Sequence, residues 1–247
     1  MQIDTQLLLL SSSRTPGAGF LEHAQGFIRE FLGQRVRRVL FIPYAGVSHS
    51  YAEMAEKTTA VFTEMGYEME GLHTSSDPVA TLREAEAVAV SGGNTFCLLS
   101  LMQSLGLLEV LRERAHAGMP YIGWSAGSNL ACPTIRTTND MPIVWPKDCD
   151  ALGLIPFQIN PHYTELLPPE HQGETRDDRL REFARLNPGM PVLGLREGSA
   201  LMVQGPRIRL LGGHDAKLFH LGSSREVCPE ESLEFLLRQP PQRRSAS

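Results

Sequence analysis

The sequence has 247 residues, of which 42% are hydrophobic and 21% charged, and its formal net charge is −5. This composition is ordinary for a globular protein with a sizeable core, and the acidic balance argues against a nucleic-acid-binding role. No run approaches the roughly 20 apolar residues of a membrane span, and no cysteines are spaced as CxxC. We therefore expect a cytoplasmic protein with a single α/β domain over residues 1–238 and a disordered tail over 239–247.

The first half of the chain alternates short apolar runs with segments whose apolar residues recur at helical spacing. We expect strands at 6–10, 38–43, 67–72, 87–90 and 120–124, and helices at 20–32, 51–65, 78–86, 96–105 and 107–117. Alternation of this kind predicts an α/β fold, with a mainly parallel sheet flanked by helices on both faces. In such sheets the functional residues gather at the carboxyl ends of the strands.

The second half is richer in proline and has shorter elements. A charged helix is expected at 175–186, a strand at 191–195, and a small C-terminal β-hairpin with strands at 200–203 and 207–211.

Ser125 has one glycine two residues before it and another two residues after it, in the pattern G-x-S-x-G. An apolar run precedes it and a helix-compatible run follows, which is the context of a nucleophile elbow. Side chains at Gly123 and Gly127 would collide with neighbouring backbone in so tight a turn. The pattern predicts that Ser125 is a nucleophile and that the N–H of Ala126 faces a developing oxyanion. The alternative is a βα turn whose small residues serve only close packing.

A serine hydroxyl needs a base, usually a histidine oriented by a carboxylate. His162 follows a short apolar strand directly, where a loop at the sheet edge would carry it. From this placement alone, a turn histidine that hydrogen-bonds backbone is an equally good interpretation. Glu197 also follows an apolar strand, and Asp140 lies in a loop nearer to Ser125 in the sequence. Spacing cannot rank these two acids, because triad members meet only in the folded chain.

The order of residues argues against one familiar hydrolase fold. In an α/β-hydrolase the serine is followed by the acid and then by a late histidine, which here would be His214 or His220. That fold also normally has an HGGG-type oxyanion loop, whereas this chain has the glycine pair 92–93 after a strand.

Several longer stretches resemble the peptidase E family, the α-aspartyl dipeptidases. They are residues 91–95, 123–144, 158–162, 173–176 and 194–198. The resemblance covers most of the chain, from the first strand to the last hairpin, and is weakest at the N-terminus and after His220.

The resemblance implies a serine peptidase with a class I glutamine amidotransferase-like (flavodoxin-like) fold that cleaves dipeptides, and some short amides, with an N-terminal L-aspartate. The family's serine falls on Ser125, its histidine on His162 and its glutamate on Glu197. Asp140 also matches a family position and is the alternative third member. Gly93 is expected to supply a second oxyanion N–H beside that of Ala126.

Aspartate selectivity requires a cation for the β-carboxylate of the substrate. Arg176 is the candidate, because a guanidinium matches a carboxylate with two parallel hydrogen bonds. The alternative is that Arg176 belongs to a solvated helix face, together with Arg179 and the neighbouring aspartates.

The expected partner is a small Asp-Xaa peptide, with neither nucleic acid nor membrane, bound by a monomer or homodimer. The chemistry needs no metal or organic cofactor. Two other functions fit the same residues: a cyanophycinase-like hydrolase of β-aspartyl linkages, and a catalytically silent homologue that binds acidic ligands.

Overall fold

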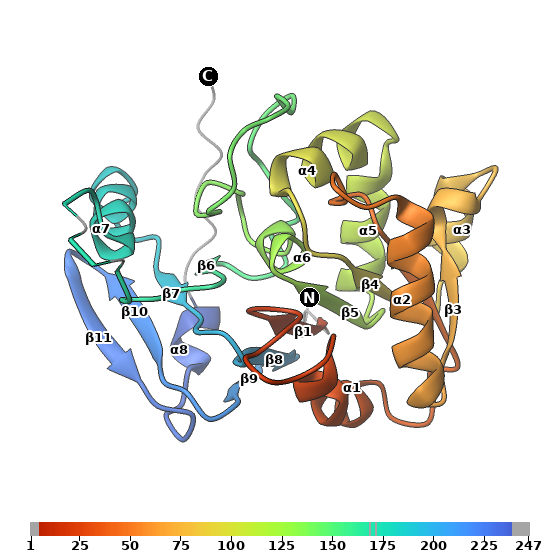
Figure 1. The fold of residues 1–247 in the computed structure, drawn as a ribbon, viewed down its shortest axis with the longest axis horizontal. Helices are drawn as coiled ribbons and strands as arrows, with labels where there is room; N and C mark the ends of the chain where they lie inside the picture. Colours follow the sequence, from red (N-terminus) through yellow and green to blue (C-terminus); the bar gives the residue numbers. More distant parts are fainter. Residues whose placement is uncertain (1–4, 168, 171, 239–247) are drawn as a thin grey trace.

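A seven-stranded sheet forms the larger part of the fold in the computed structural model (Figure 1). The structure describes residues 5–167, 169–170 and 172–238, so the tail expected at 239–247 lies outside the described residues. The strand order is β3-β2-β4-β5-β1-β8-β9. The strands are β1 (Gln6–Leu10), β2 (Arg38–Ile42), β3 (Glu68–Gly71), β4 (Ala87–Val90), β5 (Tyr121–Trp124), β8 (Ala200–Gln204) and β9 (Arg207–Leu211).

The first five strands in that order are parallel, and the β8–β9 hairpin adds two antiparallel strands beside β1. The expected α/β fold with a mainly parallel sheet and a C-terminal hairpin is thus confirmed. The carboxyl ends of the parallel strands share one edge, which brings the ends of β1, β4 and β5 together.

Helices cover both faces of this sheet (Figure 1). Alternate leucines of β1 enter two cores: Leu8 and Leu10 pack with α1 (Gln25–Leu32) and α2 (Tyr51–Glu64), while Leu7 and Leu9 face the opposite side. On that side lie α3 (Pro78–Glu84), α4 (Thr95–Ser104), α5 (Leu107–His116) and α6 (Ala126–Leu130). The period of two along a strand explains this partition. Two short 3₁₀ helices, Glu22–Ala24 and Leu72–Thr74, complete this half.

A second, four-stranded sheet was not predicted from the sequence. Its strand order is β11-β10-β7-β6, formed by β6 (Gln158–Asn160), β7 (Val192–Gly194), β10 (Ala216–His220) and β11 (Ser223–Val227). It lies beside the first sheet, with α7 (Arg176–Leu186) packed on it (Figure 1). Ile159, Leu193 and Leu218 of this sheet belong to the same core cluster as Leu7 and Leu201 of the first, so one apolar core joins the two sheets. The last helix, α8 (Glu234–Leu237), contributes Leu236 to that core.

Local sequence signals account for the helix ends that matter most for the site. Ser50 and Glu53 form a capping box at the start of α2, and the Asn94 side chain accepts from the N–H of Cys97 at the start of α4. Gly106, with φ of 67°, separates α4 from α5.

Within the described residues, no single helix is long and apolar enough to span a membrane. The helices α4 and α5 pass that test only as a pair, which is bent by 97°.

Candidate active site

Ser125 lies at the end of β5, on the turn that leads into α6. Its φ of 52° and ψ of −110° are unusual for a residue with a side chain, and such a conformation costs about 1–3 kcal/mol. Hydrogen bonds hold the turn in place: the N–H of Ser125 donates to the carbonyl of Leu10 (3.1 Å), and the hydroxyl of Ser128 donates to the same carbonyl (2.7 Å). The predicted strand–turn–helix around the serine is therefore present.

The two glycines of the elbow are required by close backbone contacts. A Cβ on Gly123 would lie 2.5 Å from the carbonyl oxygen of Gly127, and one on Gly127 would lie 2.3 Å from that of Val90. Both distances are far below van der Waals contact with rigid backbone. The glycines thus allow β4, β5 and α6 to approach one another beneath Ser125.

Ser125, His162 and Glu197 form a continuous hydrogen-bonded chain. The hydroxyl of Ser125 lies 3.0 Å from Nε2 of His162, and Nδ1 of His162 lies 2.8 Å from Oε1 of Glu197. Both distances are within hydrogen-bond reach. The chain has the geometry that general-base activation of a serine requires, because one ring nitrogen meets the hydroxyl while the other meets a carboxylate.

The second sheet delivers the histidine and the glutamate side by side. β6 and β7 are parallel neighbours, so their carboxyl ends lie at the same edge, with His162 and Glu197 each just beyond one of them. The backbone N–H of Tyr163 donates to the carbonyl of Leu195 (2.9 Å), which extends the pairing past the strand ends. His162 itself has φ of 53°, a second strained residue at this site.

Ser11, at the end of β1, joins the two sheets at the site. Its hydroxyl accepts from the backbone N–H of His162 (2.9 Å) and donates to the carbonyl of Leu195 (2.7 Å). Sequence reasoning missed Ser11 as a site residue. Its position directly after a buried strand, at the edge where functional residues gather, was the available signal.

The carboxylate of Asp140 contacts the first residue of α4 and does not contact His162. This carboxylate accepts from the backbone N–H of Thr95 (2.7 Å) and from the hydroxyls of Thr95 (2.5 Å) and Thr138 (3.1 Å). Within the described residues, the carboxylate hydrogen-bonded to His162 is that of Glu197. The structure therefore assigns Asp140 a capping position, and the alternative triad that includes it is not assembled.

The glycine pair after β4 borders the nucleophile. A Cβ on Gly92 would lie 3.2 Å from Cβ of Ser125, and one on Gly93, whose φ is 140°, would lie 2.1 Å from the carbonyl oxygen of Ala45. Ala126 is the first residue of α6, so its N–H has no carbonyl partner within that helix. The two residues expected to bind an oxyanion thus lie on the two loops that meet at Ser125.

A cavity of about 620 Å³ opens beside the serine. This volume lies within the usual range for small-molecule sites. Both members of the Ser125–His162 pair reach it, and its other lining residues are Ser13, Arg14, Phe20, Phe41, His49, Glu53, Met54, Lys57, Thr58, Gly92, Gly93 and Trp124.

Arg176 is not among the residues that line this cavity. It is the first residue of α7, its side chain is half-buried, and its Nη1 atom has no hydrogen-bond partner among the described residues. Burial lowers the pKa of this guanidinium, and the charge of Arg179 lowers it further. The structure therefore does not bring Arg176 to the lining of the cavity beside Ser125.

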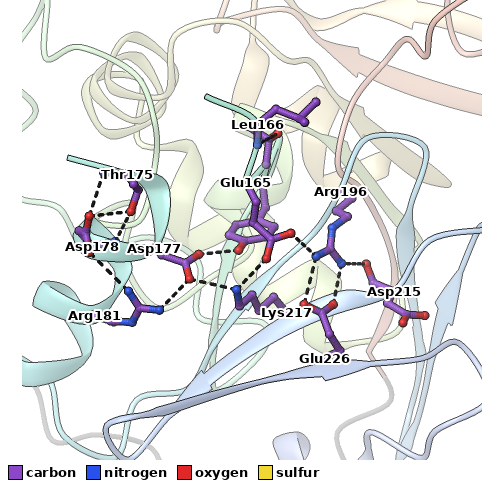
Figure 2. A network of polar contacts seen from close by, with 12 residues as sticks. Glu165, Leu166, Thr175, Asp177, Asp178, Arg181, Arg196, Asp215, Lys217 and Glu226 are labelled. Atoms are coloured by element: carbon purple, nitrogen blue, oxygen red, sulfur yellow. Dashed lines mark hydrogen bonds and ion pairs between the residues drawn. The ribbon is translucent and has the colours of Figure 1, made fainter. Parts of the chain in front are cut away.

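A network of charged side chains joins the loop after β6, the loop after β7 and the start of α7 to strands β10 and β11 (Figure 2). Arg196 bonds the carboxylates of Glu165 (2.6 Å) and Glu226 (2.8 Å), and Lys217 bonds Glu165 (2.7 Å) and Asp177 (3.0 Å). The hydrogen bonds from Lys217 and Arg196 lower the pKa of Glu165 to about 2. Glu165 is therefore ionised throughout the neutral range.

The same network holds the residue that follows His162 and the residue that precedes Glu197. The guanidinium of Arg196, which precedes Glu197, lies 5.4 Å from the ring centroid of Tyr163, which follows His162. The hydroxyl of Tyr163 donates to Asp177 on α7, and burial followed by this hydrogen bond raises the pKa of the tyrosine. The loop after β6, the loop after β7 and the start of α7 are thus held together. Sequence reasoning missed this network, because its members are scattered over about 60 residues.

A family model described as Peptidase family S51 matches residues 7–211. The chain belongs to this family.

Named relatives agree with that assignment. The chain is 46% identical over 235 residues to a protein named "Peptidase E" from a Nostoc species, covering 95% of this chain and 97% of the relative. It is 48% identical over 244 residues to a Drosophila melanogaster protein named "Probable alpha-aspartyl dipeptidase", covering 94% and 98%.

Two solved structures share the fold of this family member. A peptidase from an acI-B1 Actinobacterium superposes with a TM-score of 0.67 at 16% identity, covering 94% of this chain and 97% of the other. A chain from Listeria monocytogenes gives a TM-score of 0.65 at 23% identity, covering 85% and 99%.

Proposed function

We propose that this family S51 member is a serine peptidase that hydrolyses dipeptides with an N-terminal aspartate through Ser125, His162 and Glu197. The observation that carries the proposal is the unbroken hydrogen-bonded chain from the serine hydroxyl through the imidazole to the carboxylate. Membership of the family supports the peptidase activity, and the name of the Drosophila relative supports the aspartyl dipeptide as substrate.

The reaction proceeds in two steps. Ser125 attacks the carbonyl carbon of the aspartyl residue while His162 accepts the hydroxyl proton. His162 then gives that proton to the leaving amine, the C–N bond breaks, and an aspartyl ester of Ser125 remains. Water, deprotonated by the same imidazole, attacks this ester and releases aspartate, with the proton returning to the serine. Glu197 orients the ring and stabilises the imidazolium in both steps.

The N–H groups of Ala126 and Gly93 are proposed to bind the oxyanion of both tetrahedral intermediates. They sit on loops that are fixed before substrate arrives, so no reorganisation is needed at the moment of reaction. A donor of this kind contributes about 3 kcal/mol to transition-state stabilisation.

Arg176 remains the proposed ligand of the substrate β-carboxylate. Its Nη1 atom lacks a hydrogen-bond partner among the described residues, and its neighbour Asp177 belongs to the network that reaches both loops of the site. Replacing Arg176 by Gln should raise KM for Asp-Leu and leave the slow hydrolysis of Asn-Leu unchanged.

The proposed function is tested by comparing peptides that differ at one position. Purified protein should release leucine from Asp-Leu, with little or no release from Leu-Leu or from β-aspartyl-leucine. Ser125→Ala should abolish the release, whereas Ser104→Ala, at an exposed serine of α4, should retain it. Preferential cleavage of the β-aspartyl peptide would instead identify a β-aspartyl hydrolase, and full activity in Ser125→Ala would refute the mechanism.

A further inference from the structure

The cavity beside Ser125 has an aromatic wall. The ring of Trp124 stacks on Phe41 with centroids 6.0 Å apart and meets Phe20 edge-to-face at 6.1 Å. Met54, a flexible apolar side chain, also lines the cavity. A wall of this composition suits an apolar side chain, because it offers aromatic and thioether surface and only one polar group, the indole N–H of Trp124.

Two cations lie on the lining of the same cavity. Arg14 comes from the loop after β1 and Lys57 from α2, with Nζ of Lys57 4.5 Å from the ring centroid of Phe20. Burial lowers the pKa of Lys57, and the positive charge of Arg14 lowers it further. Because both side chains line one cavity, an anion bound there would be attracted by both charges.

Within the described part of the chain, neither cationic side chain forms a hydrogen bond or ion pair with a carboxylate. The acidic residue that lines the cavity, Glu53, instead accepts from the backbone N–H and hydroxyl of Ser50 (both 2.8 Å) as part of the capping box of α2. Two cations on one cavity, neither bonded to the Glu53 carboxylate of the same lining, favour the binding of an anion beside the apolar wall.

We infer that Arg14 and Lys57 bind the C-terminal carboxylate of the residue released from Ser125, while the aromatic wall receives the side chain of that residue. The inference rests on the proposed dipeptidase function and deepens it. An aspartyl side chain is a single methylene and a carboxylate, so it would leave the wall formed by Phe20, Phe41 and Trp124 unused. A leaving residue such as leucine has both an apolar side chain and a carboxylate, which match both features of the cavity.

This assignment predicts that a dipeptide is a better substrate than a longer peptide. In a tripeptide the corresponding position carries an amide, which cannot neutralise the two cations. The protein therefore selects length by charge at the leaving side of the bond, independently of how it recognises aspartate.

The test compares Asp-Leu with its C-terminal amide, Asp-leucinamide, in the intact protein. Lys57→Met and Arg14→Met should each lower kcat/KM for Asp-Leu about tenfold, the lower end of what a charge-assisted hydrogen bond contributes. Hydrolysis of the amide should be slower than that of Asp-Leu in the unchanged protein and should not fall further in either variant. Lys57→Arg should restore most of the loss, and Arg35→Gln, at an exposed cation outside the cavity, should have no effect.

Two results would overturn the inference. An equal loss on Asp-Leu and on the amide would place the cations at another group of the substrate, and no loss on either would remove them from substrate binding. A binding measurement keeps the question separate from turnover: Asp-Leu should bind Ser125→Ala protein about tenfold more tightly than the Ser125→Ala/Lys57→Met protein by calorimetry. If the unchanged protein cleaves no aspartyl dipeptide, the proposed function fails, while this comparison still decides whether the cations bind the carboxylate.

Discussion

Replacing Glu197 by Gln is expected to slow turnover by about 10- to 100-fold with little change in KM. The carboxylate lies 2.8 Å from Nδ1 of His162, and in the proposed mechanism it stabilises the imidazolium that forms only during the reaction. With the charge centres about 4 Å apart, the attraction is about 1 kcal/mol in water and about 4 kcal/mol at an effective dielectric constant of 20. The two side chains are 38% and 49% exposed, so solvent screens the pair and the middle of that range applies. A loss of about 1.4–2.7 kcal/mol corresponds to the stated factor.

Asp140→Asn is the matched comparison for this acid. Asp140 accepts from the N–H of Thr95 at the first turn of α4, so the substitution should cost about 1 kcal/mol of folding free energy and have a smaller effect on kcat. Leucine release from Asp-Leu gives kcat and KM for both variants, and urea unfolding gives their stability. The reasoning fails if Glu197→Gln keeps kcat within twofold of the unchanged protein, or if Asp140→Asn loses more kcat at the same folded fraction.

Three further substitutions test other features of the structure. Gly127→Ala should lower the free energy of unfolding in urea by several kcal/mol and also reduce activity, because the added Cβ would lie 2.3 Å from the carbonyl oxygen of Val90. Gly26→Ala, at an open position of α1, should be neutral or stabilising by up to about 1 kcal/mol. Equal effects of the two substitutions would contradict the packing described for the elbow. Arg196→Met should lower kcat several-fold, because it removes the contacts of Arg196 with Glu165, Glu226 and Tyr163, and Arg196→Lys should restore part of the loss. An unchanged kcat in Arg196→Met would show that these contacts do not position Glu197. Burial lowers the pKa of His116 below 6.5 in the folded protein, so folding releases protons and stability should fall as the pH drops below 6.5. His116→Gln should weaken that pH dependence, measured as the difference in unfolding free energy between pH 7 and pH 5; an unchanged dependence would exclude this histidine as a source.

The first sheet could be predicted from the sequence because its signals are local. Four of the five parallel strands are short, almost wholly buried runs, such as β1 and β4, while the edge strand β3 is partly exposed. The helices α2, α3 and α4 begin at side-chain caps that the sequence displays. β11 has a mostly exposed pattern that differs little from a loop, and β10 pairs with it and with β7 across the chain. The second sheet was missed for that reason.

The candidate site likewise contains residues that the sequence reveals and residues that only the fold reveals. Ser125 is visible in the sequence because the elbow is defined by glycines within two residues of it. The choice between Glu197 and Asp140 depends on contacts across 35 residues of chain, which spacing does not encode. Arg14 and Lys57 carry no motif and are recognised only because the fold brings both to the lining of one cavity.

The two sheets divide the reactive groups between them. Ser125 is fixed to the first sheet through Leu10, whereas His162 and Glu197 extend from the second, with Ser11 bonding across the junction. Sliding of one sheet against the other by a single ångström would separate the hydroxyl from the imidazole while leaving every secondary-structure element intact. Under the proposed mechanism, hydrolysis is therefore a more sensitive reporter of how the two sheets are docked than circular dichroism.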